Sequence, residues 1–181
     1  MITAIVYNSK TGSCERYARE LSAKLHVPCH PLKKAPVRSD GKVIFVGWVM
    51  AGKVMGYPQA AKKLDVAAVV AVGMAPAGEK SAAACREKNQ IPAEVACFCV
   101  QGAFHMDKLP GPMKLIMKWK VKDIAKQLEP ARAKGLLTPQ TQALYRMATT
   151  GEGEPASWDV SEIVAWAKEA YHMNGALRQQ K

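Results

Sequence analysis

The stretch "IVYNSKTGSCERYARELSAKL", residues 5–25, joins three kinds of sequence within a short span. Its apolar start is typical of a buried strand, and its last part, from Tyr17 to Leu25, repeats apolar residues at helical spacing. Between them lies "SKTGSC", Ser9–Cys14, which is rich in hydroxyls and holds one glycine. A helix that begins directly after such a loop offers free backbone N–H groups to an anion. We therefore expect a phosphate-binding loop here; a capped helix start without a ligand is the alternative.

The same alternation continues along the chain. Apolar runs of strand length lie at residues 27–32, 42–48, 66–74 and 94–102, with helical patterns between them at Pro58–Leu64 and Glu79–Lys88. Continuous apolar runs are typical of parallel strands buried on both faces. The sequence therefore predicts an α/β protein with a parallel sheet covered by helices on both sides. With 181 residues, we expect residues 1–181 to form a single domain.

Composition narrows the class of protein. Hydrophobic residues make up 49% and charged residues 23%, as in ordinary globular domains. No apolar stretch is long enough for a transmembrane helix, and the N-terminus lacks the pattern of a signal peptide, so we expect a cytoplasmic protein. Five cysteines without a C-x-x-C pair indicate neither a disulfide framework nor a zinc site, and no metal is expected. Cys97 and Cys99 would share one face of a strand, where packing is favoured over a redox pair.

The later part of the chain departs from the alternation of strands and helices. A helical pattern runs from Lys108 to Gln127, the polar segment Leu128–Pro155 follows, and a last amphipathic helix is expected at Ser157–Met173. We interpret residues 111–155 as an insertion before the last helix. We expect one apolar stripe on the inserted helix to pack on the domain, formed by Met113, Ile116, Met117, Val121, Ile124 and Leu128.

Four lysines of the inserted helix follow each other at four-residue spacing: Lys114, Lys118, Lys122 and Lys126. Leu115 and Trp119 lie beside them, and the chain has a formal net charge of +11. A basic helix edged by Trp and Leu is suited to an anionic membrane surface. The alternative is an ordinary solvated lysine face. Nucleic acid is not expected as a partner, because surface aromatics interleaved with the charge are missing.

The loop "SKTGSC" matches neither G-x-x-x-x-G-K-[ST] nor G-x-G-x-x-G. It resembles the flavodoxin phosphate loop, [ST]-x-T-G-x-[ST]: Ser9, Thr11 and Gly12 match, and Cys14 stands where a hydroxyl is usual. The stretches "VIFVGWVMAGKVMGYPQAAKKL", "ACFCVQGAFHMDKL", "PMKLIMKWK" and "SWDVSEIVAWAKEA" follow in the order found in menaquinone-dependent protoporphyrinogen dehydrogenases, which are flavodoxin-like enzymes.

This resemblance implies a doubly wound five-stranded parallel sheet of order 2-1-3-4-5, with helices on both faces and a basic helix inserted before the last one. It also implies FMN as cofactor. The phosphate would be held by Ser9, Lys10, Thr11, Gly12, Ser13 and Cys14. The flavin ring would lie between the loop formed by Trp48, Val49, Met50, Ala51 and Gly52 and the loop that begins with Gly73 and Met74.

By the same resemblance, the expected function is that of an FMN-dependent oxidoreductase. It would pass electrons from a reduced substrate, a porphyrinogen, to a quinone, at the inner face of the membrane as a peripheral protein. The alternative is a flavodoxin-type electron carrier for a protein partner, although carriers of this type are typically acidic. No residue stands out as a general acid or base, so catalytic residues are not assigned.

Overall fold

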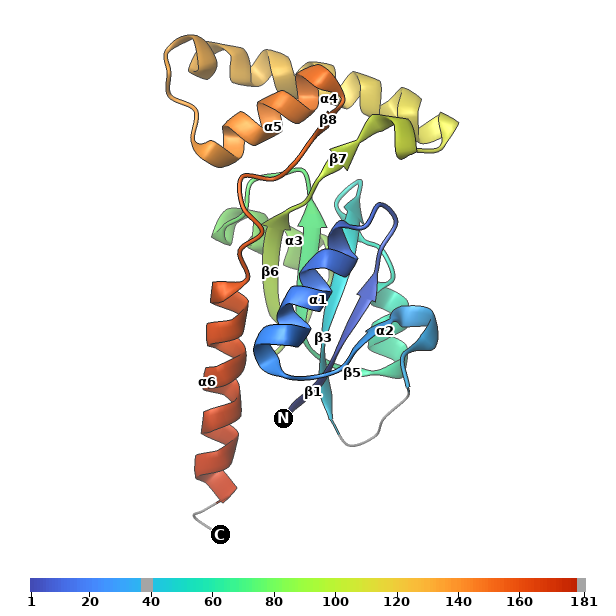
Figure 1. Ribbon diagram of the computed structural model, residues 1–181, viewed down its shortest axis with the longest axis vertical. Coiled ribbons are helices and arrows are strands. Elements are labelled where there is room, and N and C mark those ends of the chain that lie inside the picture. Colours follow the sequence, from blue (N-terminus) through green and yellow to red (C-terminus); the bar gives the residue numbers. More distant parts are fainter. Residues whose placement is uncertain (37–40, 179–181) are drawn as a thin grey trace.

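The computed structural model describes residues 1–36 and 41–178, with side chains described through residue 170. A central sheet is covered by helices on both faces, and two further helices lie beyond the carboxyl ends of its strands (Figure 1). The elements of the layered part are β1 (Ile2–Asn8), α1 (Ser13–Leu25), β2 (Cys29–Pro31), the 3-10 turn η1 (Leu32–Lys34), β3 (Lys42–Met50), β4 (Lys53–Val54), α2 (Tyr57–Lys63), β5 (Asp65–Gly73), α3 (Glu79–Asn89), β6 (Ala96–Gln101) and α6 (Ser161–Arg178).

The main strands pair in the order β2-β1-β3-β5-β6, and all of these pairs are parallel. Counted along the chain without the short β4, this is the order 2-1-3-4-5. The flavodoxin-like doubly wound fold predicted from the sequence is therefore confirmed. β4 adds an antiparallel ribbon to the end of β3.

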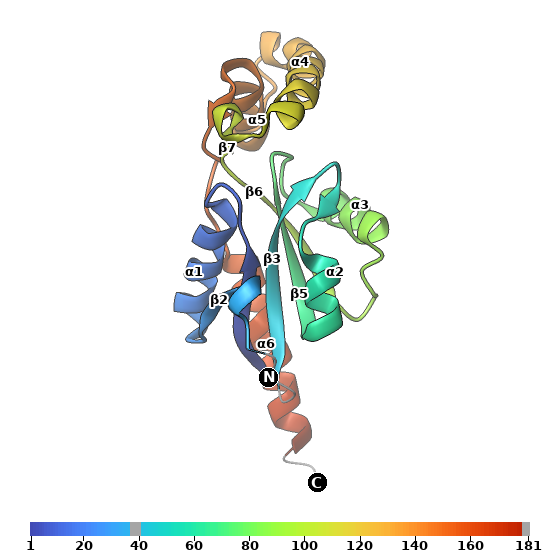
Figure 2. The same cartoon turned by 90° about the vertical axis from the view of Figure 1, so that its right-hand side faces the viewer.

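The two faces of the sheet are covered by different helices, α1 and α6 on one side and α2 and α3 on the other (Figure 2). Tyr17 and Leu21 of α1 and Ile163 of α6 are buried in the first core. Tyr57 of α2 and Cys85 of α3 are buried in the second. Because β3 and β5 lie between both cores, residues 43–47 of β3 and 66–72 of β5 are buried without interruption, which explains their continuous apolar runs.

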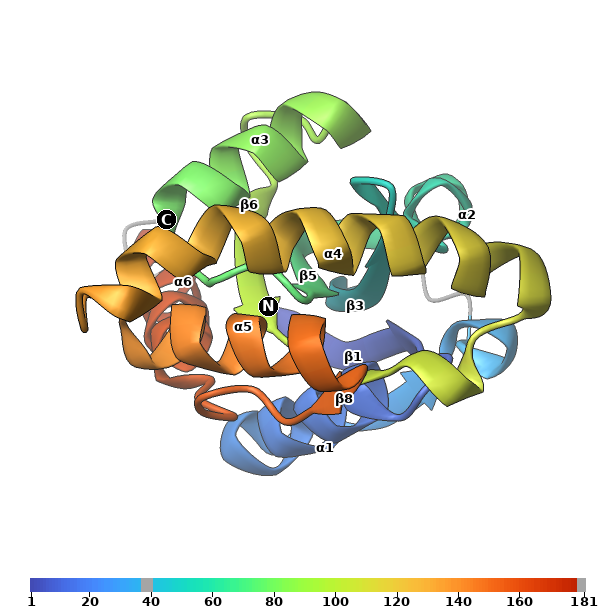
Figure 3. The same ribbon diagram turned by 90° about the horizontal axis from the view of Figure 1, so that it is seen from above.

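Residues 104–153, which we call the cap, leave the layered body after β6 and return before α6. The cap begins and ends with a two-stranded antiparallel ribbon and contains a 3-10 turn and two helices: β7 (Phe104–His105), η2 (Met106–Lys108), α4 (Gly111–Ala133), α5 (Pro139–Thr150) and β8 (Glu152–Gly153). Seen from above, α4 and α5 cross over the sheet side by side (Figure 3). They enclose a small core of their own, formed by Phe104, Val121, Ala143, Met147 and Ala148.

Helix α5 adds to the sequence analysis, which described Leu128–Pro155 only as a polar segment and assigned no helix to it. Thr138 caps its start, with the side chain accepting from the Thr141 N–H at 3.2 Å, and Pro139 follows in the first turn. Gly151, in the left-handed region at φ 79°, ends the helix. These are ordinary helix signals, but two of the four buried residues of the helix, Ala143 and Ala148, are small.

The last helix begins later than expected, at Ser161. Asp159 accepts hydrogen bonds from the backbone N–H and the hydroxyl of Ser161, at 2.9 and 2.8 Å, and so caps this start. The expected apolar positions are buried as far as side chains are described: Val160, Ile163, Val164 and Ala167. The side chains of Tyr171 and Met173 lie outside the described residues.

Candidate functional site

The predicted phosphate loop lies at the carboxyl end of β1, and Gly12 sets its shape. Gly12 has φ of 101°, a conformation that favours glycine. A Cβ added there would meet no atom within 4 Å, so the space in front of it is open. Its N–H donates to the Ser9 Oγ at 3.2 Å, which closes the loop. Helix α1 starts immediately after Gly12 and directs the unpaired N–H groups of its first turn to this end of the sheet.

The side chains of the loop divide into two groups. Lys10 is exposed, and Ser9 and Thr11 are partly exposed, whereas Ser13 and Cys14 are buried. The Ser13 Oγ accepts from the backbone N–H of Ala103 at 3.1 Å and so joins α1 to the segment after β6. Cys14 is only 1% exposed within the first core, and burial raises the pKa of its thiol to about 12. The Cys14 side chain therefore packs in the core and does not line the loop.

Trp48, one of the residues expected beside the flavin ring, lies close to the loop and packs against the first core. The Nζ atom of Lys10 is 5.6 Å from the centroid of the Trp48 ring, within the range of a cation–π contact. Trp48 belongs to β3 and is paired in register with Val72 of β5. The fold thus brings a residue of the phosphate loop and a residue of the expected ring site together.

The expected loop at Trp48–Gly52 is only partly a loop. Strand β3 continues through Met50 and returns as β4 after a two-residue turn. Ala51 (φ 49°) and Gly52 (φ 80°) both have positive φ, as a tight hairpin turn with the twist of its strands requires. Gly52 faces α3, because its carbonyl accepts from the Asn89 amide at 2.9 Å. The residues called a loop from the sequence are therefore a strand end and a hairpin.

Gly73 and Met74 lie at the carboxyl end of β5. The Gly73 carbonyl accepts from the Gly102 N–H at 2.7 Å, and the Val49 side chain is 3.5 Å from the place of a Cβ on Gly73. Met74 packs against the core of the cap. The two expected ring loops therefore meet through Val49 and Gly73, while Met74 lies beneath the cap.

Gln101 connects these parts and was missed by the sequence analysis. Its side chain is buried, at 4% exposed. The amide nitrogen donates to the carbonyls of Met74 at 3.0 Å and Gln140 at 3.1 Å, and the amide oxygen accepts from the Ala156 N–H at 3.3 Å. One side chain thus joins the loop after β5, helix α5 of the cap and the segment that leads to α6. The only signal in the sequence is a polar residue that ends an apolar run.

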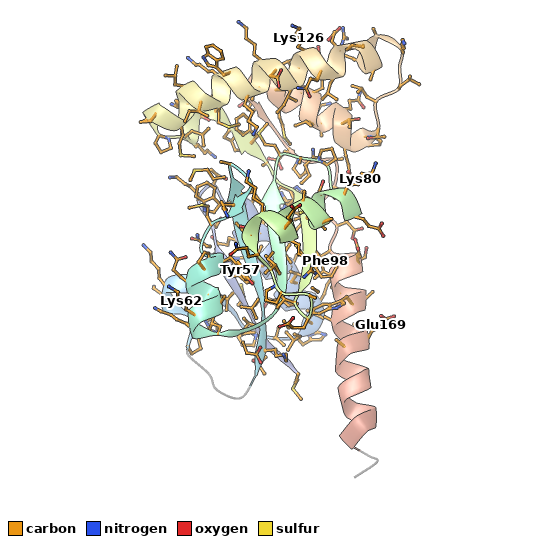
Figure 4. The ribbon with its side chains drawn as sticks, turned by 180° about the vertical axis from the view of Figure 1, so that it is seen from behind. Tyr57, Lys62, Lys80, Phe98, Lys126 and Glu169 are labelled. Atoms are coloured by element: carbon orange, nitrogen blue, oxygen red, sulfur yellow. The ribbon has the colours of Figure 1, made fainter. Side chains whose placement is uncertain are left out.

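A cavity of about 170 Å³ lies elsewhere, at the β6 edge of the sheet. Its lining includes Tyr17, Phe98, Gln101, Gln140 and Glu162, but no residue of the phosphate loop Ser9–Cys14. Phe98 and Glu169 mark this edge in Figure 4, on β6 and α6. The cavity therefore lies apart from the place expected for a flavin.

Helix α4 presents an outer surface that combines apolar and basic side chains. Leu115 is 64% and Trp119 80% exposed. At 100° per residue, Leu115, Trp119, Lys122 and Lys126 fall within about 60° of one another around the helix. We call these four residues the outer face of α4. Lys118 is exposed at its border.

Two expectations about α4 need correction. Ile116 was expected in the packed apolar stripe, but it is 67% exposed. Met117, Val121 and Ile124 of α4 pack in the cap core, and Ile116 points about 110° away from their mean direction. Lys114 is half-buried, because residues four apart drift by about 40° per step and the row does not stay on one face.

Comparisons of the chain with models of known protein families, with curated proteins and with solved structures found no match. In the described part of the chain, no helix is both long and apolar enough to cross a membrane. Among the same residues, no three His, Cys, Asp or Glu side chains are grouped so as to hold a metal ion.

Proposed function

We propose that this protein binds FMN and is an oxidoreductase that passes electrons from a reduced organic substrate to a quinone. The observation that carries the proposal is the meeting of the phosphate loop with Trp48. The loop follows β1, whose neighbours β2 and β3 lie on opposite sides, so it stands where the strand order reverses. In open α/β sheets this is the place where ligands bind.

The residues at this place suit a ligand that carries both a phosphate and a flat ring. Backbone N–H groups at the start of α1, the hydroxyls of Ser9 and Thr11, and the charge of Lys10 are the groups for the phosphate. Gly12 leaves its front open, so the backbone can approach the ligand closely. Trp48 offers a flat apolar surface for stacking. When bound, FMN supplies the redox chemistry, and these residues bind and orient it.

The substrate and acceptor come from the resemblance alone: a porphyrinogen is the proposed electron donor, and a quinone the acceptor. The electron carrier for a protein partner remains the second candidate. The net charge of +11 counts against the carrier, because carriers of this type are typically acidic and a carrier with this charge needs an acidic protein partner.

We propose that the quinone lies in an anionic membrane. The protein binds the cytoplasmic side of this membrane as a peripheral protein, through the outer face of α4. Leu115 and Trp119 supply apolar contact, and Lys122 and Lys126 supply charge, aided by Lys118. Lysines near an anionic surface contribute about 1 kcal/mol each. A few lysines therefore hold the protein reversibly, and salt weakens the attachment.

Titration of the purified protein with FMN, followed by quenching of flavin fluorescence, tests the cofactor. Gly12→Ala adds a methyl group in front of the loop and should weaken FMN binding at least about tenfold, a loss of about 1.4 kcal/mol. Gly135→Ala is the control, because Gly135 also has positive φ and faces open space, but lies in the cap between α4 and α5. Equal affinity in Gly12→Ala and wild type would contradict the site.

Enzyme and carrier are separated with the FMN-loaded protein. The enzyme should oxidise a porphyrinogen and reduce a quinone over many turnovers with no other protein present. FMN binding without such turnover would leave the carrier as the function.

Flotation with vesicles tests the membrane partner. Wild type should float with phosphatidylglycerol vesicles at low salt and not with phosphatidylcholine vesicles. Lys122→Gln with Lys126→Gln should remove most of this binding, whereas Lys62→Gln with Lys63→Gln on α2 should not, because Lys62 and Lys126 lie on separate parts of the molecule (Figure 4). Equal loss in both variants would mean that only total charge matters.

A further inference from the structure

Three thiols meet between α3 and the strand β6, on the side of the sheet away from α1. Cys85 lies on the buried side of α3, and Cys97 and Cys99 lie on β6 and pack against the same core. All three are free cysteines. Their meeting was not visible in the sequence, where only Cys97 and Cys99 stood close together.

The geometry favours Cys85 and Cys97 as a pair, because Cys97 contacts α3 one turn before Cys85, although Cys99 also lies within hydrogen-bonding reach of Cys85. The Cys97 thiol donates to the Ala82 carbonyl at 3.6 Å, and Ala82 lies one turn before Cys85 on α3. A hydrogen bond between the Cys85 and Cys97 thiols, together with burial, raises the pKa of Cys97. Thiols already in contact need little movement to form a bond.

Cys97 and Cys99 make a poor pair with each other. Residues two apart on a strand have Cα atoms about 6.6 Å apart and parallel side chains, which lies near the upper limit for a disulfide. Bonding them would distort β6 within its parallel ladder to β5, where Cys97 pairs with Val69 and Cys99 with Ala71.

We propose that Cys85 and Cys97 form a redox-active dithiol, which a low-molecular-weight disulfide oxidises to an intramolecular disulfide between α3 and β6. Cys97 is half-buried and meets the reagent first. Its thiolate attacks one reagent sulfur and releases one thiol, which leaves a mixed disulfide on Cys97. The Cys85 thiolate then displaces the second thiol. The two cysteines lose two electrons and two protons, and the reagent gains both as two thiols.

The local environment makes this exchange slow at neutral pH. The Cys97 contact lowers the pKa of Cys85, but a hydrogen bond with Cys99 and burial outweigh it and raise the pKa to about 11. Only a small fraction of either thiol is therefore thiolate near pH 7, and the thiolate is the attacking form.

The dithiol is connected to the hairpin of β3 and β4 through Asn89. The Asn89 amide nitrogen lies 3.6 Å from the Cys85 Sγ and donates to the Gly52 carbonyl, while its oxygen accepts from the Val54 N–H at 2.7 Å. A bond from Cys85 to Cys97 takes the Cys85 sulfur out of its contact with Asn89. Oxidation should therefore change the protection of the Val54 amide.

The test uses the purified full chain without added cofactor, so it does not depend on FMN binding. Incubation with oxidised glutathione should reduce the number of free thiols from five to three, with a mass loss of two hydrogens and a linked pair of peptides containing Cys85 and Cys97. Cys99→Ser should behave as wild type. Cys97→Ser should form no intramolecular bridge.

Hydrogen exchange supplies the second measurement. Oxidation should change the exchange rate of the Val54 amide at least about threefold in wild type and leave it unchanged in Cys85→Ser. A bridge between Cys85 and Cys99 or between Cys97 and Cys99, bridges only between molecules, or persistent reduction of Cys85 and Cys97 would overturn the proposal. A bridge at the proposed pair without a change at Val54 would overturn its connection to the hairpin.

Discussion

The layered body and the cap are built by different rules. In the body, side chains such as Phe45 and Val69 are fully buried between a sheet and its helices, and two large cores share one sheet. In the cap, two helices enclose a small core centred on Met147, while Leu115, Ile116 and Trp119 are left exposed on α4. Packing explains the sequence of the body, but it explains only one side of α4.

The exposed side of α4 is not explained by folding stability. An exposed Trp beside lysines contributes little to folding, and such patches commonly mark surfaces of interaction. We infer that the body holds the ligand and that the cap provides its contact with a partner. Four changes test this division.

Phe45→Ala should have the largest effect, a loss of about 3–5 kcal/mol in the free energy of unfolding, because it leaves a large cavity in the middle of the sheet. Met147→Ala creates a similar gap in the cap core. It should accelerate hydrogen exchange in α4 and α5 and leave the amides of β3 and β5 protected. Urea unfolding combined with exchange measures both. If Met147→Ala lowers the stability of the body as much as Phe45→Ala, the two regions fold as one unit.

Gln101→Leu should loosen the cap on the body. The change leaves the Met74 and Gln140 carbonyls and the Ala156 N–H without their partner, at a cost of about 1–3 kcal/mol for each group that water does not reach. Gln142→Leu, on the exposed side of α5, is the matched control. Faster exchange of α5 amides in Gln101→Leu alone is the expected result. Equal rates in the two variants would show that the cap is held by other contacts.

Alkaline pH should reveal the burial of Cys14. Burial raises the folded pKa of Cys14 to about 12, above the ordinary thiol value of 9.0, so the unfolded chain loses this proton first and stability falls as pH rises from about 9 to about 12. Between these pH values, the free energy of unfolding of wild type should fall by about 1.4 kcal/mol per pH unit more than that of Cys14→Ala. Tyr17, whose pKa burial also raises to about 12, is common to both proteins and cancels in the difference. Parallel pH profiles would place Cys14 in contact with water at the loop.

Trp119→Ala should have the smallest effect on stability, below about 0.5 kcal/mol, because the side chain is 80% exposed. Val121→Ala, on the buried side of the same helix, should cost clearly more. The order should be reversed in vesicle flotation, where only Trp119→Ala loses binding. A large loss of stability in Trp119→Ala would mean that the side chain packs within the protein.

The sequence predicted the body well because its signals are strong. Runs such as residues 42–48 and 66–74 are apolar on both faces of a strand, and the helices between them are amphipathic. The loop Ser9–Gly12 was located from the sequence because hydroxyl residues and glycine are typical of the turn between a strand and a helix. Cys14 was misjudged, since a motif gives a position along the chain but not the direction of a side chain.

The cap was harder to predict for the opposite reason. The buried side of α5 includes Ala143 and Ala148, which give a weak apolar pattern. The role of Gln101 depends on three backbone groups that are far apart in the sequence. The meeting of Cys85 with Cys97 depends on how α3 is rotated against the sheet. Such contacts are set by tertiary packing, which no local pattern records.

The antiparallel ribbon between body and cap has a consequence for how this chain can be altered. Phe104 faces Gly153 and His105 faces Glu152, so the polypeptide enters and leaves the cap at neighbouring points. A segment that enters and leaves at neighbouring points can be inserted, shortened or exchanged as a single gene segment without changing the strand order of the sheet. A variant that joins residue 105 to residue 152 by a tight turn should therefore still assemble the parallel strands. The cap can then be removed or replaced in the laboratory without changing the order of the parallel strands.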